Sequence, residues 1–224
     1  MKNYLARQKD ILSETEEKRL ENLNIMIAGA GGLGTNQAVQ FQRLGINKIY
    51  LYDYDQVELS NLNRQICYGR NDIGRYKVDV AAEFLNNFEL DTEIIPCRKK
   101  IKKNLDLLQD IDIIMDAFDN FTSRFILEEL AVENNIPMIH GGIEGWFGQV
   151  MNIIPGKTAL LKDVFAGAEN DKKPAVISPA VSITANYQVV EAVKIVLEKP
   201  DILINKLLLI NVLTGEIEKI DINR

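Results

Sequence analysis

Three glycines in the segment GAGGLG, residues 29–34, have the spacing of a phosphate-binding loop. Gly29, Gly31 and Gly34 fit the pattern G-x-G-x-x-G between an apolar run and a helical pattern. Glycine lets the backbone approach phosphate oxygens, and the N-terminus of the following helix offers free N–H groups and a partial positive charge. We therefore expect these three glycines and Gly32 to bind a nucleotide. A tight strand-to-helix turn without a ligand is the simpler alternative.

Asp53 lies about 20 residues beyond the loop, at the end of the next apolar run, where a carboxylate can accept hydrogen bonds from ribose hydroxyls. Taken with the glycines alone, this carboxylate favours NAD as the ligand. An NAD-dependent oxidoreductase is therefore one hypothesis.

The polar segment from Tyr54 to Lys77 favours a triphosphate over NAD. It holds a group of side chains suited to phosphate: Asn61, Arg64, Gln65 and Lys77. Arginine offers a planar fork to two phosphate oxygens, and lysine offers a mobile point charge. A leaving pyrophosphate needs such cations, whereas NAD needs few. Taken singly, Arg64 and Lys77 are ordinary surface cations; together, they are predicted to be catalytic.

Asp119 closes the apolar segment IDIIMDAFD, residues 111–119. The carboxyl ends of parallel strands face the ligand crevice of an open α/β sheet. A carboxylate there can hold Mg²⁺ that bridges phosphates, so we predict a catalytic and metal-binding role for Asp119. Capping of the following helix is the alternative role. Asp116, further inside the strand, is a weaker metal-binding candidate.

Alternating strands and helices must position these residues. Strands are expected at 24–29, 47–53, 92–97, 111–119 and 136–142, and helices at 13–22, 32–43, 75–88 and 121–135. This alternation predicts an α/β, Rossmann-like fold with a mainly parallel sheet and helices on both faces. Ser13 and Glu16 form a capping-box pattern at the start of the first helix.

The pattern changes after Gly142. A strand is expected at 146–156, a long helix at 179–198 and a β-hairpin at 206–222 that turns at Thr214–Gly215. The hairpin is expected to add antiparallel strands to one edge of the sheet. Residues 157–178 have no firm periodicity, and a long irregular segment within a compact domain is usually functional or mobile.

Composition narrows the function classes. The chain has 224 residues, 46% of them apolar, and a net charge of −6, so general affinity for nucleic acid is not expected. Its two cysteines, Cys67 and Cys97, have no paired spacing, which argues against a disulfide framework and a four-cysteine zinc site. The N-terminus has no apolar signal region, and no run reaches transmembrane length. We expect a cytoplasmic protein that does not bind a membrane.

Five segments carry a resemblance that spans nearly the whole chain: GAGGLG at 29–34, DYDQVELSNLNRQ at 53–65, DIGRYK at 72–77, DAFDN at 116–120 and HGGIEGWFGQV at 140–150. Together they resemble the ubiquitin-activating-enzyme-like superfamily, in particular the ThiF/MoeB/HesA adenylyltransferases. The segment from Asp53 to Lys77 is the most specific of these likenesses.

The resemblance implies ATP-dependent adenylation of the C-terminal carboxylate of a small ubiquitin-like sulfur-carrier protein with a Gly-Gly tail, of the thiamine or molybdopterin type. By the same likeness, Gly31 and Gly32 approach the phosphates, Asp53 holds the ribose and Asp119 binds Mg²⁺. Asn61, Arg64 and Lys77 contact phosphate and stabilise the transition state, and Gln65 lies nearby. Arg7, in LARQ, reaches the ATP site of a neighbouring subunit, which implies a homodimer.

A single ThiF-type adenylation domain is expected over residues 1–224. Its nucleotide-binding half covers about 1–120, and its carrier-binding half, with a crossover loop, covers about 121–224. The chain departs from the family pattern in two respects. It lacks paired C-x-x-C motifs, so no zinc is expected. It also has no cysteine in 157–178, so covalent capture of the carrier by this segment is excluded.

Rival functions remain at this point. An enzyme of the same superfamily, of the tRNA threonylcarbamoyladenosine dehydratase type, would act on tRNA. The basic run RKKIKK at 98–103 weakly favours such a partner or an acidic carrier, while a solvated edge is the simpler interpretation. A non-catalytic nucleotide-binding module is a further rival.

Four single residues are ambiguous. His140 is either a hydrogen-bonded structural residue or a proton carrier. Trp146 and Phe147 either pack in the core, which we favour slightly, or line the groove for the carrier tail. Cys67 is expected to be a buried structural thiol, with a reactive role as the alternative.

Overall fold

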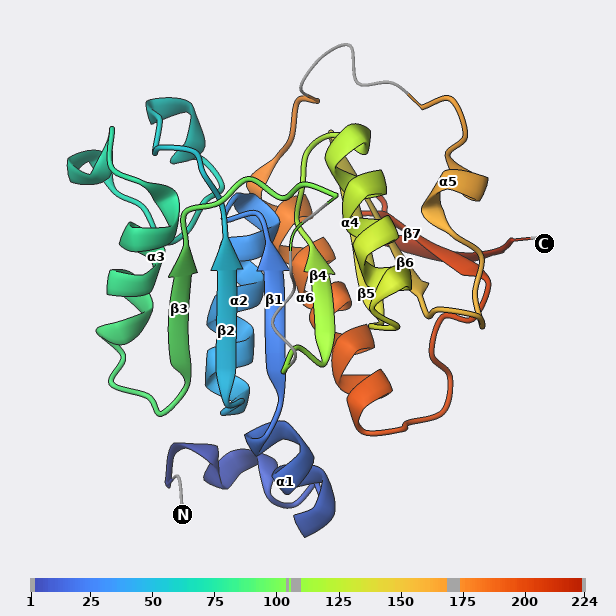
Figure 1. Ribbon diagram of the computed structural model, residues 1–224, viewed down its shortest axis with the longest axis horizontal. Coiled ribbons are helices and arrows are strands. Elements are labelled where there is room, and N and C mark those ends of the chain that lie inside the picture. The colour runs from blue at the N-terminus through green and yellow to red at the C-terminus, as the bar shows by residue number, and fades with distance from the viewer. Residues whose placement is uncertain (1–2, 104, 106–109, 169–173, 223–224) are drawn as a thin grey trace.

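A computed structural model describes residues 3–103, 105, 110–168 and 174–222 (Figure 1). Its eight strands form one sheet in the order β3-β2-β1-β4-β5-β6-β7-β8. The first five strands in this order, β3 to β5, run parallel to one another, and the pairs from β5 to β8 are antiparallel. The strands are β1 (Asn24–Ala28), β2 (Lys48–Tyr52), β3 (Glu93–Cys97), β4 (Ile113–Asp116), β5 (Met138–Glu144), β6 (Phe147–Ile153), β7 (Lys206–Asn211) and β8 (Glu216–Asp221). The predicted Rossmann-like fold with an antiparallel edge is confirmed.

Helices connect the strands close to where the sequence predicts them. The α-helices are α1 (Glu14–Glu21), α2 (Gly32–Leu44), α3 (Lys77–Asn86), α4 (Phe121–Glu133), α5 (Leu161–Val164) and α6 (Ser178–Val196), and the short 3-10 helices are η1 (Asn3–Gln8), η2 (Leu59–Asn61) and η3 (Arg70–Asp72). The polar segment 54–74, which has no clear periodicity, contains η2 and η3. The hairpin of β7 and β8 turns at the predicted position.

The sheet separates two cores because successive side chains of a strand point to opposite faces. In β1, Ile25 and Ile27 join the core shared with α2, α3 and α6, whereas Met26 and Ala28 join the core shared with α4 and α5. Figure 1 shows α2 and α6 behind the sheet and α4 in front of it. Helices therefore cover both faces, as the sequence predicts.

The helix ends follow local signals with one correction. The side-chain hydroxyl of Ser13 accepts from the backbone N–H of Glu16, and Glu16 accepts from the N–H of Ser13, so the predicted capping box forms. Gly45 ends α2 in a left-handed conformation. At the start of α4, however, Asn120 caps the helix by accepting from the N–H of Ser123 at 2.8 Å. The capping role considered for Asp119 therefore belongs to its neighbour.

The strand predicted at 111–119 ends at Asp116, before Asp119. Asp116 turns the chain, since its Oδ1 accepts from the backbone N–H of Phe118 at 3.1 Å, an Asx-type contact that competes with the strand ladder. This turn puts Asp119 on a connection at the carboxyl edge of the sheet.

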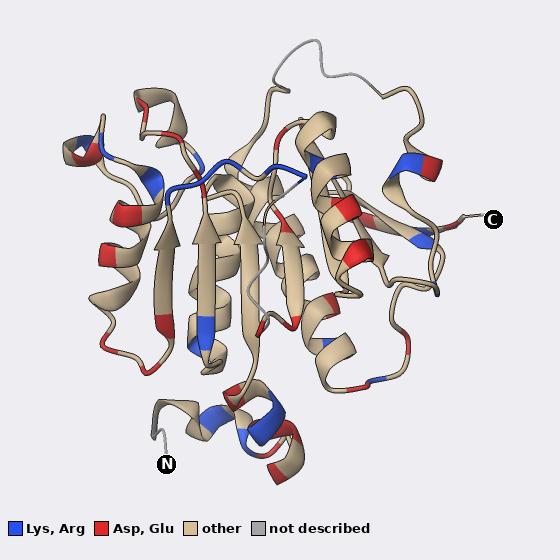
Figure 2. Cartoon of the chain, viewed as in Figure 1, with Lys and Arg blue, Asp and Glu red and all other residues tan. Residues whose placement is uncertain are grey.

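A basic connection crosses the carboxyl ends of the strands. In Figure 2 the segment that follows β3, coloured blue where its residues are Lys or Arg, runs over the tops of β2 and β1 toward α4. This is the run at 98–103, so its position in the fold is next to the ligand edge of the sheet.

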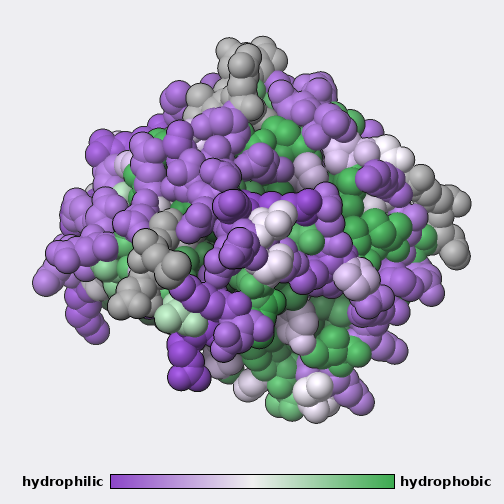
Figure 3. Space-filling view, turned by 90° about the horizontal axis from the view of Figure 1, so that it is seen from below, coloured by the Kyte–Doolittle hydropathy of each residue, from purple (hydrophilic) through white to green (hydrophobic). Residues whose placement is uncertain are grey.

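No helix in the described part of the chain is long and apolar enough to span a bilayer. The face viewed from the amino ends of the strands is largely hydrophilic, with smaller hydrophobic patches between the polar side chains (Figure 3).

Candidate active site

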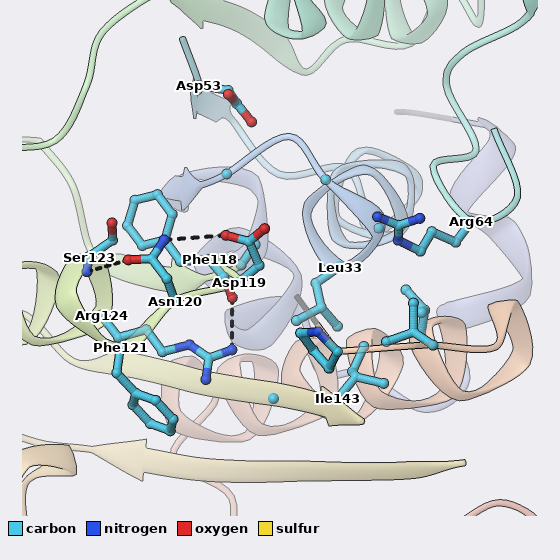
Figure 4. A pocket seen from close by; sticks show the side chains of 18 of the residues that line it. Leu33, Asp53, Arg64, Phe118, Asp119, Asn120, Phe121, Ser123, Arg124 and Ile143 are labelled. Atoms are coloured by element: carbon cyan, nitrogen blue, oxygen red, sulfur yellow. Dashed lines mark hydrogen bonds between the residues drawn. The ribbon is translucent and has the colours of Figure 1, made fainter. Parts of the chain in front are cut away.

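A pocket of about 580 Å³ lies at the carboxyl edge of the parallel strands. Its lining comes from both parts of the sheet: the glycine loop, the ends of β2 and β4, the segment after β2, the basic connection, and β5 and β6. Figure 4 shows Asp53, Arg64 and Asp119 around this cavity, with Asn120 and Arg124 at the start of α4. The topology therefore gathers most of the predicted site residues in one place.

The glycine loop needs the absence of side chains at defined points. Gly29 has φ +112°, and a Cβ there would lie 2.8 Å from the backbone oxygen of Ala117. Gly31 is the N-cap of α2 and Gly32 its first residue, and both line the pocket. Gly34 does not line it; a Cβ there would lie 1.8 Å from the carbonyl oxygen of Gly29. Gly34 therefore lets α2 pack closely against the loop.

Both backbone groups of Ala30, inside the loop, are held by the segment after β2. The N–H of Ala30 donates to Asp53 Oδ2 at 2.8 Å, and its carbonyl accepts from the Tyr68 hydroxyl at 2.7 Å. Asp53 Oδ1 accepts from the N–H of Asp55 at 2.8 Å. Tyr68 has no counterpart among the residues predicted from the sequence. These contacts fix the loop before any ligand arrives.

Asp53 lines the pocket as predicted, and its environment is mixed. Burial raises the pKa of the Asp53 carboxyl, while the nearby charge of Lys77 and the N–H groups of Asp55 and Ala30 oppose that rise. A carboxylate has about four acceptor positions, so oxygen lone pairs remain for ribose hydroxyls after the two backbone bonds.

Lys77 and Arg64 both line the pocket but are held differently. The Lys77 side chain is nearly buried, with Nζ 3.2 Å from Asp55 Oδ2. The Arg64 side chain is half-buried, and its Nη1 donates to Ser60 O and Asn63 Oδ1. Lys77 is thus preorganised, whereas Arg64 must exchange local partners for a ligand.

Asn61 and Gln65 divide structural and ligand-facing roles. Asn61 does not line the pocket; its Oδ1 accepts from the N–H of Glu58, and its carbonyl accepts from the N–H groups of Arg64 and Gln65. It therefore shapes the turn that carries Arg64. Gln65 lines the pocket beside Gly31, and its buried Oε1 has no partner among the described residues. A buried polar atom without a partner calls for a ligand or water.

Asp119 lies on the pocket wall and accepts from Asn120 Nδ2 at 3.3 Å. Among the described residues, no group of three or more His, Cys, Asp or Glu side chains is placed to hold a metal. One carboxylate is enough for Mg²⁺, which usually takes one or two carboxylates and completes its shell with phosphate oxygens and water.

Apolar residues form the pocket wall beyond Asp119. Phe118, Phe121, Phe147, Phe165 and Leu209 line this part. The favoured assignment of Trp146 and Phe147 to the core is wrong, because their exposed fractions are 41% and 54%. They lie at the turn between β5, which ends at Glu144, and β6, which begins at Phe147. Of the two, Phe147 lines the pocket and Trp146 does not.

The basic run is only partly a solvated edge. Lys99 and Lys100 line the pocket, whereas Arg98 pairs with Asp79 and Lys103 pairs with Glu129. The sequence run itself could not tell which of its cations face a ligand.

A buried polar cluster behind the wall was not predicted as a unit. Arg124 lines the pocket, lies 3.6 Å from Asp116 Oδ2 and donates to the carbonyls of Phe118 and Gly141. His140 is fully buried, with Nδ1 2.7 Å from Asp116 Oδ2. Burial lowers the pKa of His140, while the hydrogen bond to Asp116 opposes this. His140 is therefore structural in this state, one of the two roles considered.

Two predicted features lie away from the pocket. Arg7 is exposed on η1, which lies at the amino ends of the strands, opposite the pocket (Figure 1). Cys67 is buried, as expected, and burial raises the pKa of its thiol to about 12. The part of the irregular segment at 169–173 falls outside the described residues, while Phe165, Pro174 and Val176 line the pocket.

Two solved structures share this fold. The structure of Escherichia coli MccB with ATP superposes with a TM-score of 0.80 at 23% identity, covering 93% of this chain and 66% of that one. PaaA gives a TM-score of 0.77 at 22% identity, covering 99% and 80%. At such identities the likeness establishes the fold alone.

Sequence relatives are more specific. The chain is 33% identical over 187 residues to the sulfur carrier protein ThiS adenylyltransferase of Bacillus subtilis strain 168, covering 80% of this chain and 56% of that protein. It is 31% identical over 215 residues to the probable molybdopterin-synthase adenylyltransferase of Porphyra purpurea, covering 92% and 56%. The chain thus spans little more than half the length of these curated relatives. The sequence model of the ThiF family matches residues 5–224, and the chain belongs to that family.

Proposed function

We propose that this chain is an ATP-dependent adenylyltransferase that activates the C-terminal carboxylate of a small ubiquitin-like sulfur-carrier protein. One observation carries the proposal: Arg64 and Lys77, from the segment after β2, line the same pocket as Gly31 and Gly32 at the N-terminus of α2. The names of the relatives, which include a ThiS adenylyltransferase, support this class of substrate.

The proposed reaction forms one bond and breaks one. A carboxylate oxygen of the carrier attacks the α-phosphorus of ATP, the bond between that phosphorus and the β-phosphate oxygen breaks, and pyrophosphate leaves with the electron pair. An acyl adenylate remains. The carboxylate is already ionised near neutral pH, so no general base is needed. Catalysis then depends on alignment and charge neutralisation, which the helix N-terminus, Arg64 and Lys77 supply.

The predicted residues that line the pocket have these further roles in the scheme. Gly29, Gly31 and Gly32 let the phosphates approach the backbone, Asp53 holds the ribose and Gln65 offers its unpartnered Oε1. Asp119 would hold Mg²⁺, which when bound neutralises phosphate charge. No zinc is proposed.

The carrier tail is proposed to enter along the apolar wall. The carrier-binding half, about 121–224, contributes Phe121, Phe147 and Phe165 to this wall, and the nucleotide-binding half, about 1–120, contributes the glycine loop. The segment 157–178 is proposed to guide the tail, because three of its residues, Phe165, Pro174 and Val176, line the pocket.

A homodimer is proposed because η1, the helix that carries Arg7, lies at the end of the sheet opposite the pocket (Figure 1). Any contact of Arg7 with an ATP site would then be made across a subunit interface. Mixing Arg7→Ala subunits with Arg64→Ala subunits tests this, because one pocket of each mixed dimer then has both arginines. Partial recovery of activity is expected, and mixed dimers without activity would remove Arg7 from the site. A cytoplasmic location is proposed, because the two cysteines are unpaired and ATP is required.

ATP–pyrophosphate exchange against sulfur carriers ending in Gly-Gly tests the function. Exchange that depends on a carrier is expected. Binding of NADH without exchange would support the oxidoreductase instead. Retention of tRNA at two salt concentrations, with no response to carriers, would support the tRNA-modifying rival. ATP binding with no exchange for any carrier would leave only a binding module.

A further inference from the structure

Gln149, on β6, joins the pocket to the buried polar cluster behind it. It lines the pocket and lies opposite Gly142 of β5 in the strand register. A Cβ at Gly142 would lie 2.8 Å from Gln149 Nε2 and 3.0 Å from its Cγ. The missing side chain at Gly142 therefore lets the Gln149 amide lie across β5 and reach His140.

The amide of Gln149 has one favoured orientation because of His140 and Asp116. The Asp116 carboxylate, beside Arg124, accepts hydrogen bonds, so His140 Nδ1 carries the proton that points at Oδ2, 2.7 Å away. The buried imidazole is neutral, since burial lowers its pKa. Its Nε2 is then an acceptor, and the atom 3.2 Å away must be the NH₂ group of Gln149. A flipped amide would place two lone pairs against each other.

This orientation turns Gln149 Oε1 away from His140. No described residue donates a hydrogen bond to that oxygen, and two apolar side chains lie near the amide: Leu209 is paired with Gln149 in the strand register, and the Phe165 ring centroid lies 5.7 Å from that of His140. An acceptor beside such apolar side chains favours a ligand that donates to it and penalises a ligand that lacks a donor.

We propose that Gln149 Oε1 accepts the N–H of the last peptide bond of the substrate tail, and that His140 and Asp116 are positioning residues that hold this oxygen in place. The inference rests on the proposed function, because it takes the tail of a protein carrier as the substrate. It deepens that function by naming the feature that selects a peptide end over other carboxylates.

One measurement needs no substrate. His140 is the only histidine of the chain, so nitrogen-labelled histidine gives a single imidazole in an NMR spectrum. The neutral form with the proton on Nδ1 is expected at pH 7. The proton on Nε2, or a charged ring at that pH, would overturn the inference whatever the enzyme activates.

The second measurement replaces one atom of the substrate. A semisynthetic ThiS-type carrier ending in Gly-Gly is compared with one whose last glycine is glycolic acid, so that an ester oxygen replaces the N–H. We expect the ester carrier to lower kcat/KM for exchange about ten- to a hundredfold, mainly through KM. Gln149→Met should lower kcat/KM for the amide carrier similarly and abolish the discrimination between the two carriers.

The control is Gln40→Met, a half-buried glutamine on α2 outside the pocket lining, which should keep wild-type discrimination. A purely structural role for Gln149 would lower both carriers equally and leave their ratio unchanged. That result, or a wild-type enzyme that does not distinguish the carriers, overturns the inference while the proposed function stands. No exchange with either carrier refutes the proposed function itself, and with it the peptide partner of Gln149.

Discussion

Replacing Lys77 by methionine tests whether charge in the pocket drives the proposed chemistry. Lys77 begins α3, and a cation in the first turn of a helix is unfavourable by about 0.3–1 kcal/mol. Its side chain is 9% exposed, so it gains little from solvent. A residue placed against both helix dipole and hydration is better explained by function than by stability. Methionine keeps most of the apolar stem and removes only the charge.

The expected effects of Lys77→Met on stability and on the rate of exchange differ in size. At 3.2 Å, the Lys77–Asp55 pair would be worth at most about 5 kcal/mol with an effective dielectric constant of about 20. The Asp55 side chain is 49% exposed, so screening reduces this contribution to about 1 kcal/mol. Loss of one preorganised charge at a transition state costs about 3–4 kcal/mol, or about a hundred- to thousandfold in rate. Activity should therefore fall far more than stability.

The assay is carrier-dependent ATP–pyrophosphate exchange, paired with urea unfolding. Lys48→Met is the matched control, because Lys48 lies at the amino end of β2, away from the pocket, and pairs with Asp110 at 3.3 Å. We expect wild-type exchange in the control. If Lys77→Met kept exchange within about threefold of the wild-type rate, the decrease would be far smaller than the loss of a preorganised charge causes, and the assigned role would be refuted.

Four further outcomes are expected. Arg64→Lys should lower exchange at least about tenfold, because lysine has no planar fork for two phosphate oxygens, while the exposed Arg70→Lys should not; equal rates would exclude bidentate binding. Asp119→Asn should raise the Mg²⁺ concentration for half-maximal exchange at fixed ATP at least about tenfold, and an unchanged requirement would remove this carboxylate from the metal site. Gly34→Ala should lower the free energy of unfolding in urea by about 3 kcal/mol, because its Cβ meets the Gly29 carbonyl at 1.8 Å, whereas Gly156→Ala, at φ +73° with nothing within 4 Å, should cost about 1 kcal/mol; equal costs would contradict this packing. Cys67 is buried and its thiol has a pKa of about 12, so it should not react with a thiol reagent at pH 8 in the native protein. The Cys67→Ser variant should then label to the same extent as the wild type; one fewer labelled site in the variant would show that Cys67 is reactive.

Local patterns predicted the elements because their causes are local. The capping box of Ser13 and Glu16 and the turn at Thr214–Gly215 depend on a few neighbouring residues, and both form. The predicted boundaries were wrong where a side-chain oxygen accepts a hydrogen bond from a backbone N–H two or three residues further along the chain. Asp116 ended its strand early, and Asn120 took the cap considered for Asp119.

The sequence by itself determined which residues could do chemistry and, through strand order, that most of them would meet at one edge of a sheet. Gly31, Asp53, Arg64, Lys77 and Asp119 all line the pocket. Parallel strands place their carboxyl ends side by side whatever the details of packing, so this much follows from the alternation of strands and helices.

Only the tertiary structure decided how those residues are held and which others join them. Asn61 shapes a turn instead of lining the pocket, Tyr68 fixes the glycine loop, and Gln149 reaches His140 across a glycine of the next strand. These contacts join residues distant in sequence, and their geometry depends on register and burial. No local pattern encodes such distances, because the free energy of each contact is fixed by what the rest of the chain places around it.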